Sequence, residues 1–284
     1  MRVLVVGANG MIGSTIIRVL SEKPELDVFG SIRDQKSKDL FSKEIAAKLI
    51  SGIEVTLESA LLRLFKEVQP EVVINCAGLT KHLEGANDPN TAIPINALFP
   101  HRLAAFCEIS GARLIHISTD CVFSGTKGGY VETDLPDAID FYGQTKAMGE
   151  VDYPNAITLR TSTIGHELNT AYGLLDWFLS QGKQCKGFTK AIFSGLPTVV
   201  FAEIIRDIVI TRPELRGLYQ VAAEPINKYD LLKLIAHIYK KEIEIVADDS
   251  FVIDRSLDAS KFNQVTGYNP PSWQELIETM HQYQ

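Results

Sequence analysis

The sequence lacks the features that mark secreted, membrane-spanning and nucleic-acid-binding proteins. Its apolar runs are short, and the run RVLVV at residues 2–6 is too short for a signal-peptide core or a membrane span. The formal net charge is −7 and Lys and Arg form no block, so neither nucleic acid nor an anionic membrane surface is expected as a partner. We expect a cytoplasmic protein that binds small solutes.

Cysteine and histidine are too scattered to build a metal centre or a disulfide framework. The four cysteines form no C-x-x-C pair, and the six histidines are never spaced four residues apart. We therefore predict no metal and a reducing compartment. What the chain does have is 45% apolar residues over 284 positions, enough for one large α/β body or for two lobes around a cleft.

The first half of the chain alternates short β-rich runs with longer helical patterns. We expect strands at residues 2–6, 27–32, 71–78 and 112–118, and helices at residues 11–22 and 95–110. Strands separated by helices form a parallel sheet, and nearly continuous apolar runs such as EVVIN indicate strands covered on both faces. We predict an α/β fold with a doubly wound, Rossmann-like parallel sheet in a domain spanning residues 1–160.

The pattern changes after residue 160, where Gly and Pro interrupt it more often. A loop-like segment is expected at residues 161–173, and helices at residues 173–181, 199–210 and 227–240. Asn227 is the expected N-cap of the last helix. The acidic pair Asp248 and Asp249 is expected in a solvated loop. We predict a smaller α+β lobe over residues 161–284 that binds mainly substrate, with some segments returning to the first domain.

A glycine-rich turn follows the first strand and opens the first helix. Residues 7–13 have the sequence Gly-Ala-Asn-Gly-Met-Ile-Gly. Without a Cβ, Gly7 and Gly10 can form a tight turn and let the backbone approach a pyrophosphate, while Gly13 permits close packing of helix on sheet. The helix N-terminus then faces the phosphates. We predict that this turn binds a dinucleotide through Gly7, Asn9, Gly10, Met11 and Ile12.

The end of the second expected strand indicates which dinucleotide is bound. An acidic residue at this place hydrogen-bonds the ribose 2′-hydroxyl, whereas an arginine meets a 2′-phosphate. The acidic position holds Ile32, and Arg33 follows with a guanidinium that suits a phosphate. We therefore predict NADPH rather than NADH. Asp34 keeps the alternative open, because a shift of one residue would bring its carboxylate to the hydroxyl.

Helical spacing places Tyr142 and Lys146 on one helix face in the stretch FYGQTKAMGE. Side chains at i and i+4 are neighbours, with Cβ atoms ~6 Å apart. Reducing a ketone requires a hydride on carbon and a proton on oxygen, and a cation beside a phenol favours its ionised form. The spacing alone also fits a solvated Lys146 beside a packed tyrosine ring, so the rest of the chain decides.

Four motifs stand in a fixed order: the glycine turn, NCAG at residues 75–78, STD at residues 118–120, and the tyrosine–lysine pair. Together they resemble the extended short-chain dehydrogenase/reductase family. Within it, STDCVFSG, YGQTKAMGE, LRTS, GLPT and DRSLDASKF resemble dTDP-4-dehydrorhamnose reductase and related nucleotide-sugar 4-keto reductases over nearly the whole chain. The resemblance implies an oxidoreductase that reduces a nucleotide-linked 4-keto-6-deoxysugar with NADPH, for L-deoxysugar and surface polysaccharide biosynthesis.

The resemblance also implies three catalytic residues. Tyr142 is the proton donor to the nascent alkoxide. Lys146 favours the phenolate and also hydrogen-bonds the nicotinamide ribose. Thr119, at the end of an expected strand, gives a hydroxyl that can fix the orientation of the carbonyl oxygen, although a strand-end threonine can also simply cap a turn.

The same resemblance adds residues beside the cofactor. Asn75, Cys76, Ala77 and Gly78 match the strand end that passes the cofactor ribose, where ligands of open α/β sheets gather. Cys76 is expected to be a small packed residue rather than a nucleophile. Asn96 matches a position that is often Asn in the family, and we interpret it as supporting.

Two departures from the family pattern concern the sugar pocket. Many dTDP-4-dehydrorhamnose reductases have aromatic residues where this chain has Cys121 and Thr163. Smaller side chains make room, so a UDP-linked 2-acetamido-2,6-dideoxysugar is an alternative substrate. A surface loop fits Thr80 as well as a contact with substrate does. The predicted substrate-binding residues are Thr80, Thr119, Asp120, Cys121, Tyr142 and Thr163.

Two other activities remain as alternatives. A nucleotide-sugar epimerase or dehydratase is disfavoured, because Asp120-Cys121 leaves a dehydratase acid/base pair after Thr119 incomplete and Arg33 indicates a dissociable NADP. A non-catalytic, NADP-binding regulatory subunit is the other, since a relative of this reductase is the regulatory chain of methionine adenosyltransferase. Retention of the three catalytic residues favours catalysis. The superfamily also implies a possible homodimer.

Overall fold

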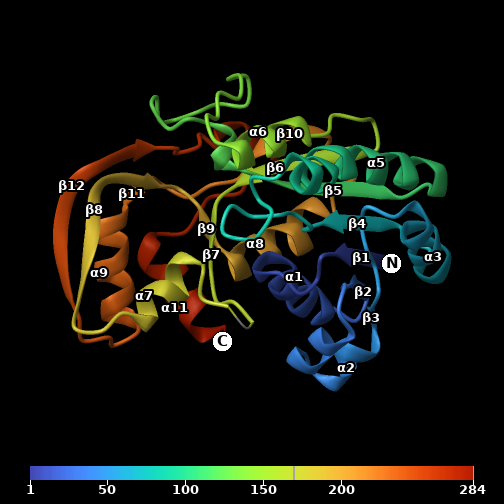
Figure 1. The fold of residues 1–284 in the computed structure, drawn as a ribbon, viewed down its shortest axis with the longest axis horizontal. Coiled ribbons are helices and arrows are strands. Elements are labelled where there is room, and N and C mark those ends of the chain that lie inside the picture. The colour runs from blue at the N-terminus through green and yellow to red at the C-terminus, as the bar shows by residue number, and fades with distance from the viewer. Residues whose placement is uncertain (169, 284) are drawn as a thin grey trace. The chain divides into compact units, whose positions relative to one another are not determined.

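The computed structural model describes residues 1–168 and 170–283 (Figure 1). The chain divides into two compact units. Unit 1 consists of Met1–Ser118, Asp140–Leu159 and Ala202–Leu218, and unit 2 of Thr119–Ile139, Arg160–Phe201 and Tyr219–Gln284. This division differs from a single boundary at residue 160, because the chain passes from unit 1 to unit 2 within three separate strands.

A seven-stranded sheet has the order β10-β6-β5-β4-β1-β2-β3. Its strands are β1 (Arg2–Val6), β2 (Asp27–Ser31), β3 (Leu49–Ile50), β4 (Val72–Asn75), β5 (Arg113–Thr119), β6 (Ala156–Thr161) and β10 (Gly217–Gln220). The strands from β3 to β5 pair in parallel, and β1 lies between β2 and β4, where the order reverses. The doubly wound, Rossmann-like fold is thereby confirmed. Ligands of such sheets bind at the carboxyl ends of the strands beside this reversal.

Helices cover both faces of the strands that form the centre of unit 1. On one face, Leu4 of β1 lies in a core with Leu103 and other side chains of α3 (Glu58–Val68) and α5 (Phe99–Ser110). Helix α1 (Met11–Ser21) lies on the opposite side of the sheet from α5 (Figure 1). Burial on both sides explains the nearly continuous apolar runs of these strands.

Several shorter helical elements connect the strands and the longer helices. They are η1 (Gln35–Leu40), α2 (Lys43–Ala47), α4 (Pro89–Ala92), η2 (Ile93–Leu98), η3 (Asp120–Val122), α6 (Phe141–Met148), α8 (Thr198–Ile204) and η4 (Ile205–Val209). Among the described residues, no helix is both long and apolar enough to cross a bilayer.

The helix predicted over residues 95–110 is two elements, the π-helix η2 followed by α5. The amide of Phe99 bonds to the carbonyl of Pro94, five residues back. Pro100 has no N–H with which to bond the carbonyl of Asn96 in an α-helix. The helix predicted over residues 199–210 likewise ends in a π-helical segment, η4.

Unit 2 is built on a three-stranded sheet of order β11-β8-β12. Its elements are β7 (Thr163–Ile164), α7 (Leu174–Ser180), β8 (Gln184–Phe193), β9 (Leu196–Pro197), β11 (Ile226–Asn227), α9 (Lys228–Ile238), β12 (Glu244–Asp254), α10 (Ser260–Thr266) and α11 (Trp273–Gln282). Phe178, Leu231, Ile235 and Ile277 lie in its core. The N-cap prediction for Asn227 is confirmed, since its side chain accepts a hydrogen bond from the Asp230 amide at 2.9 Å.

Two local predictions in unit 2 are corrected. Asp248 and Asp249 lie in β12, which pairs with β8, and not in a loop. Asp248 is held there by Lys186 of β8, at 2.8 Å, and the strand is irregular between Asp248 and Val252. The segment expected as a loop at residues 161–173 contains β7, and its residue 169 lies outside the described residues.

Candidate active site

The glycine turn lies in unit 1, at the reversal of the strand order. Gly7 has a φ of +79°, which favours glycine, and a Cβ there would lie 2.9 Å from the backbone of Ala77. A Cβ on Gly13 would lie 2.2 Å from the carbonyl oxygen of Gly7. Gly7 therefore lets the turns after β1 and β4 approach each other, and Gly13 lets α1 pack against the glycine turn itself.

The N-terminus of α1 offers backbone amides to an anion. Within the described residues this helix has no side-chain cap, because its N-cap is Gly10. Its first intrahelical bond runs from the Ser14 amide to the Gly10 carbonyl at 2.8 Å, so the amides of Met11 and Ile12 precede the hydrogen-bonded turns. Such amides at the positive end of a helix suit a diphosphate, so the turn fits the predicted dinucleotide.

Cationic side chains follow β2. Arg33 is exposed, and Lys36 and Lys38 lie in η1. Asn9 of the glycine turn donates from Nδ2 to Oγ of Ser37 in η1 at 3.3 Å. The two segments predicted to contact the dinucleotide are therefore joined, and their cations suit a 2′-phosphate.

Asp34 has a structural task beside Arg33. Its carboxylate accepts a hydrogen bond from the Lys36 amide at 3.0 Å and caps η1. Ile32 is only 2% exposed. Because Asp34 is engaged at the cap, the position after β2 favours Arg33 as the group that meets the ribose.

The turn after β4 is fixed by a buried amide. Asn75 accepts from the Ala77 amide at 3.1 Å, and its Nδ2 lies 3.1 Å from Nδ1 of His116. An amide nitrogen can only donate, so Nδ1 accepts and the neutral ring carries its proton on Nε2. Burial, and then the charge of Lys146, hold the pKa of His116 well below its usual value. Burial raises the pKa of the Cys76 thiol to about 12, which fits a packed residue.

Asn96 joins the loop after β4 to helix α6. It is 1% exposed, and its Oδ1 accepts from the Leu79 amide at 2.8 Å. Its Nδ2 donates to the Leu79 carbonyl at 3.0 Å and contacts Oγ1 of Thr145 at 3.2 Å. Asn96 therefore holds the loop beside Gly78 against the helix that carries Tyr142, which gives physical content to its predicted supporting role.

Helix α6 begins at a side-chain cap and carries the tyrosine–lysine pair. The Asp140 carboxylate accepts from the Gly143 amide at 2.8 Å. Tyr142 is half-buried, whereas Lys146 is 5% exposed and donates from Nζ to the Ile117 carbonyl at 2.9 Å. The alternative of a solvated Lys146 is therefore wrong. Burial lowers the pKa of this amine to about 8.

Thr119 begins unit 2 and caps a turn. Its Oγ1 donates to Oδ1 of Asp120 and accepts from the Cys121 amide, both at 3.1 Å. One hydroxyl has one proton, so donation to a substrate carbonyl requires release from Asp120. Burial raises the pKa of Asp120, against the Thr119 hydroxyl and the charge of Arg255. Nη1 of Arg255 lies 3.3 Å from Sγ of Cys121, so a cation stands beside one predicted substrate contact.

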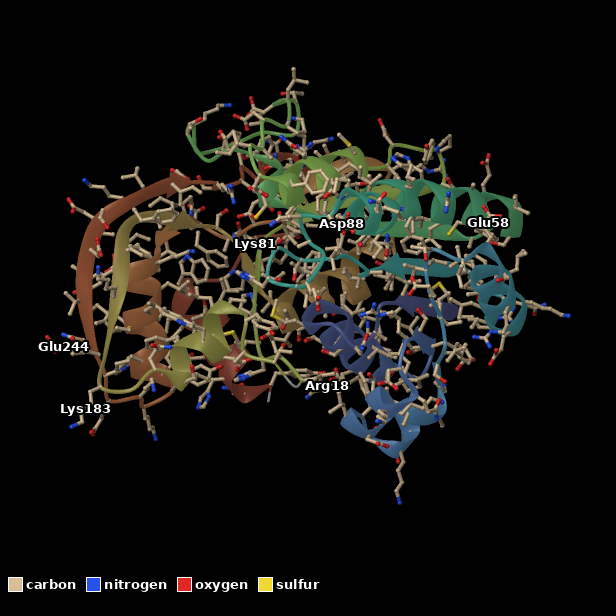
Figure 2. All side chains as sticks on the ribbon, in the orientation of Figure 1. Arg18, Glu58, Lys81, Asp88, Lys183 and Glu244 are labelled. Carbon is tan, nitrogen blue, oxygen red and sulfur yellow. The ribbon has the colours of Figure 1, made fainter. Side chains whose placement is uncertain are left out.

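Thr163 and Thr80 occupy different surroundings. Thr163 is half-buried at the start of β7, opposite Leu196. Thr80 is exposed in the loop after β4, where its carbonyl accepts from the Leu83 amide at 3.0 Å. Its neighbour Lys81 is also exposed (Figure 2). The surface-loop interpretation of Thr80 therefore fits its surroundings.

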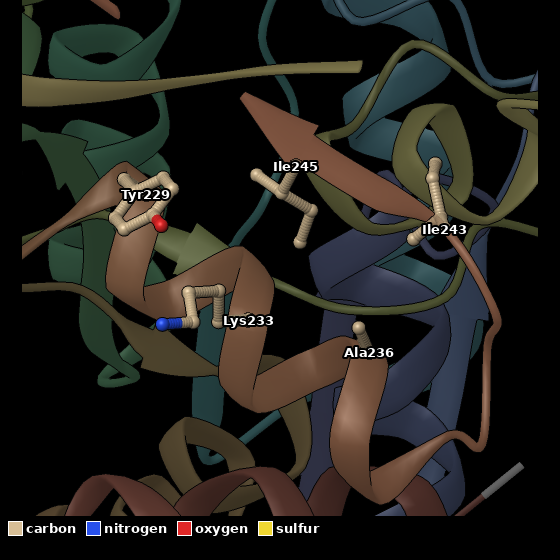
Figure 3. Close-up of a pocket in the computed structure, with 5 residues that line it drawn as sticks. All are labelled: Tyr229, Lys233, Ala236, Ile243 and Ile245. Carbon is tan, nitrogen blue, oxygen red and sulfur yellow. The ribbon is translucent and has the colours of Figure 1, made fainter. Parts of the chain in front are cut away.

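A pocket of about 250 Å³ lies in unit 2 (Figure 3). It is lined by Tyr229, Lys233, Ala236, Ile243 and Ile245. Nζ of Lys233 lies 5.2 Å from the centre of the Tyr229 ring. Three of these side chains come from α9, Ile245 comes from β12 and Ile243 precedes β12, so none of the predicted site residues lines this pocket.

Two residues beside the predicted site were missed from the sequence. Arg255 contacts Cys121 across 134 positions of sequence, and its only signal was its place in the run DRSLDASKF. His116 was counted as one of six scattered histidines, although it lies three residues before Thr119 on β5. Both side chains act through contacts that no local pattern reveals.

The sequence is similar to that of several known proteins. A family model described as the RmlD substrate binding domain matches residues 1–284. The dTDP-4-dehydrorhamnose reductase of Aggregatibacter actinomycetemcomitans is 24% identical over 99% of this chain and 99% of its own length. Methionine adenosyltransferase 2 subunit beta of Bos taurus is 29% identical over 52% of this chain and 41% of its own.

One solved structure illustrates the shared fold. The dTDP-4-dehydrorhamnose reductase of Bacillus anthracis, crystallised in complex with NADP, has a TM-score of 0.79 to this chain. The two are 22% identical, and the match covers 99% of each. The arrangement of strands and helices is therefore common to both over their whole lengths.

Proposed function

The chain belongs to the RmlD substrate binding domain family, and from that premise we propose that it is an NADPH-dependent reductase of a nucleotide-linked 4-keto-6-deoxysugar. The product serves L-deoxysugar and surface polysaccharide biosynthesis. The observation that carries this proposal is on α6, where a half-buried Tyr142 precedes by one turn a Lys146 whose amine is buried and fixed on the Ile117 carbonyl. A phenol one helical turn from a fixed cation is an arrangement that general acid catalysis can use.

The residues of unit 1 fit the dinucleotide. The amides of Met11 and Ile12 take the diphosphate, while the Gly10 amide closes the turn on the Gly7 carbonyl at 3.2 Å. Arg33 takes the 2′-phosphate. Asn9 steadies the glycine turn against η1. The turn of Cys76, Ala77 and Gly78 passes the nicotinamide ribose.

The proposed reaction assigns a separate role to each of the three catalytic side chains. The cofactor, when bound, supplies a hydride for the carbonyl carbon. Tyr142 gives its phenolic proton to the developing alkoxide, and Lys146 stabilises the phenolate that remains. Thr119 turns its hydroxyl from Asp120 to the carbonyl oxygen and fixes its orientation.

The nucleotide sugar is proposed to contact unit 2. Cys121, with Arg255 beside it, and Thr163 take places where many relatives have aromatic rings. The guanidinium of Arg255 suits an anionic or strongly polar part of the substrate. A UDP-linked 2-acetamido-2,6-dideoxysugar is the second candidate substrate, favoured by the small Cys121 and Thr163 side chains.

A cofactor-oxidation assay tests the proposal. Purified protein is supplied with NADPH and with a panel of dTDP- and UDP-linked 4-keto-6-deoxysugars, and the absorbance of the reduced cofactor is followed. Turnover with a dTDP sugar supports the proposal, and preference for a UDP sugar moves it to the second candidate. Tight NADPH binding without turnover on any sugar would contradict catalysis and support a regulatory subunit, as the similarity to methionine adenosyltransferase 2 subunit beta suggests.

The proposal extends to assembly and location. We propose a homodimer, as the resemblance to the superfamily implies, and a cytoplasmic location, because a nucleotide-sugar reductase works on soluble metabolites. Residues 1–160 are proposed to hold mainly the cofactor and residues 161–284 mainly the sugar, with Thr119, Asp120 and Cys121 as sugar contacts that come from the first range. Sedimentation of the purified protein distinguishes a dimer of about twice 31.4 kDa from a monomer.

A further inference from the structure

Lys146 lies in a buried site that disfavours its charged form. It is 5% exposed, and burial lowers the pKa of its amine to about 8, against an ordinary value of 10.5. The Ile117 carbonyl is a neutral acceptor, so it orients the amine without providing a counter-charge. A protein that needs the ammonium at neutral pH therefore needs an anion near it.

Glu150 is held near this amine, because its carboxylate bonds to Ser118, the residue that follows Ile117 on β5. It follows Lys146 by four residues, just beyond the end of α6, and it is half-buried. Its charge is the main influence that opposes the lowering of the Lys146 pKa by burial. Oε1 of Glu150 accepts a hydrogen bond from Oγ of Ser118 at 2.7 Å, and Ser118 itself is 3% exposed on β5.

We infer that Glu150, held in place by Ser118, is a positioning residue that supplies the counter-charge of the catalytic ammonium. The carboxylate acts on Lys146, and Lys146 acts on Tyr142. The benefit to catalysis rests on the proposed function, whereas the electrostatic pairing of Glu150 with Lys146 does not. The tyrosine–lysine spacing by itself does not reveal the pairing, because Ser118 comes from β5, which is distant in sequence.

The other groups that face Lys146 do not replace Glu150. Cys76, after β4, has a pKa of about 12, so its thiol is neutral at physiological pH. His116, on β5, has a pKa well below its usual value and is neutral too. The η2 element, which packs on α6, has the uncharged sequence IPINAL. His101, on α5, contacts the Met148 carbonyl at 2.8 Å and brings no negative charge.

A pH series of unfolding experiments tests the pairing without any substrate. In the unfolded chain Lys146 titrates near its ordinary pKa, so a folded state with a lower pKa binds fewer protons and loses stability as the pH falls. Glu150→Gln lowers the folded pKa of Lys146 further. We therefore expect the loss in Tm caused by E150Q to be small at pH 9 and to grow as the pH is lowered to 6.5.

Matched variants separate this effect from simple loss of a contact. Glu108→Gln removes an equal charge from an exposed position of α5 and should give no pH-dependent change. In a Lys146→Met background, E150Q should lose its pH dependence. A loss in Tm that is the same at both pH values, or that persists unchanged in the K146M background, would overturn the inference.

The catalytic consequence is read from the pH profile of kcat/KM. The active form needs the ammonium, so activity falls as the pH rises through the pKa of Lys146. E150Q should move this alkaline limb to lower pH by on the order of one unit, while Glu150→Asp keeps the charge and restores most of the profile. Ser118→Ala should shift the limb in the same direction but less, and this variant decides the matter if E150Q does not fold.

Different outcomes would contradict the role of Glu150 and the proposed reductase function. An unmoved alkaline limb in an active E150Q enzyme would overturn the role of Glu150 and leave the reductase assignment intact. No turnover on any sugar, together with the expected pH-dependent loss of stability, would overturn the proposed function and support the Glu150–Lys146 pairing.

Discussion

The central sheet of unit 1 and the three-stranded sheet of unit 2 differ in how their strands are covered. Four of the five residues of β1 and all four of β4 are buried. In β12 most residues are half-buried or exposed, and Val252 is 70% exposed. The first sheet is covered by helices on both faces, while β12 is an edge strand. Because the glycine turn is tightly packed, we expect unit 1 to tolerate few substitutions there, whereas the sheet of unit 2 should tolerate most substitutions well.

The largest effect is expected in the first turn of α6. Tyr142→Phe removes one hydroxyl that acts chiefly in the transition state, so we expect kcat to fall about 1,000-fold while the Kd for NADPH stays nearly constant. Steady-state kinetics and cofactor titration measure the two quantities. Equal losses in kcat and in NADPH affinity would mean that the Tyr142 hydroxyl acts in binding and would contradict its role as the acid.

A second pair of variants compares how well each unit tolerates an added Cβ atom. Gly13→Ala forces a Cβ to 2.2 Å from the Gly7 carbonyl, so we expect a loss of about 3 kcal/mol in the free energy of unfolding and much weaker NADPH binding. The control is Gly182→Ala in unit 2, where a Cβ meets nothing within 4 Å. Denaturant unfolding of both proteins should separate them clearly. Comparable losses would show that the units tolerate added atoms alike.

Cofactor selectivity should respond to a single cation of unit 1. Arg33→Ala removes the proposed contact with the 2′-phosphate, and we expect the Kd for NADPH to rise about 30-fold, about 2 kcal/mol, with little change for NADH. Arg102→Ala, at an exposed position of α5, is the matched control. Isothermal titration with both cofactors measures the difference. Equal weakening of NADPH and NADH would remove the 2′-phosphate assignment.

The smallest effect is expected on the exposed sheet of unit 2. Lys186 holds the pKa of Asp248 below its usual value. A carboxyl whose folded pKa is lowered stabilises the fold above its ordinary pKa and loses this contribution as the pH falls through the folded value. Asp248→Asn should therefore lower Tm slightly at pH 7, and the difference should shrink between pH 5 and pH 3.

The control for this pair is its neighbour. Asp249→Asn, whose carboxylate lies 3.2 Å from Nζ of Lys190 and is largely exposed, should leave Tm nearly unchanged. A large loss of Tm in either variant would mean that β12 is as demanding as the strands of unit 1.

The sequence was a good guide where a sheet is covered on both faces and a poor one elsewhere. The strands β1, β4 and β5 have nearly continuous apolar runs, which local composition reveals directly. The strand β12 gave no such signal, because its side chains are largely exposed and Asp248 and Asp249 interrupt it. The π-helix η2 was missed as well, because a proline such as Pro100 weakens a helical pattern without showing how the backbone adapts.

The candidate site divides in the same way. The glycine turn and the spacing of Tyr142 and Lys146 depend on a few adjacent residues, so the pattern could be recognised in the chain alone. That Lys146 is buried on the Ile117 carbonyl, and that Ser118 holds Glu150, depends on the approach of β5 to α6. The turn-capping bonds of the Thr119 hydroxyl are likewise visible only in the folded chain.

The amino-acid sequence by itself determined the alternation of strands and helices, the glycine turn and the residue types of the proposed acid and its cation. Backbone sterics and side-chain periodicity act over a few residues, so these features follow from local order. The tertiary structure alone decided which polar side chains meet, such as Arg255 with Cys121 and Glu150 with Ser118. Such contacts form only when segments far apart in the chain pack together and exclude water, and burial then lowers the pKa of Lys146.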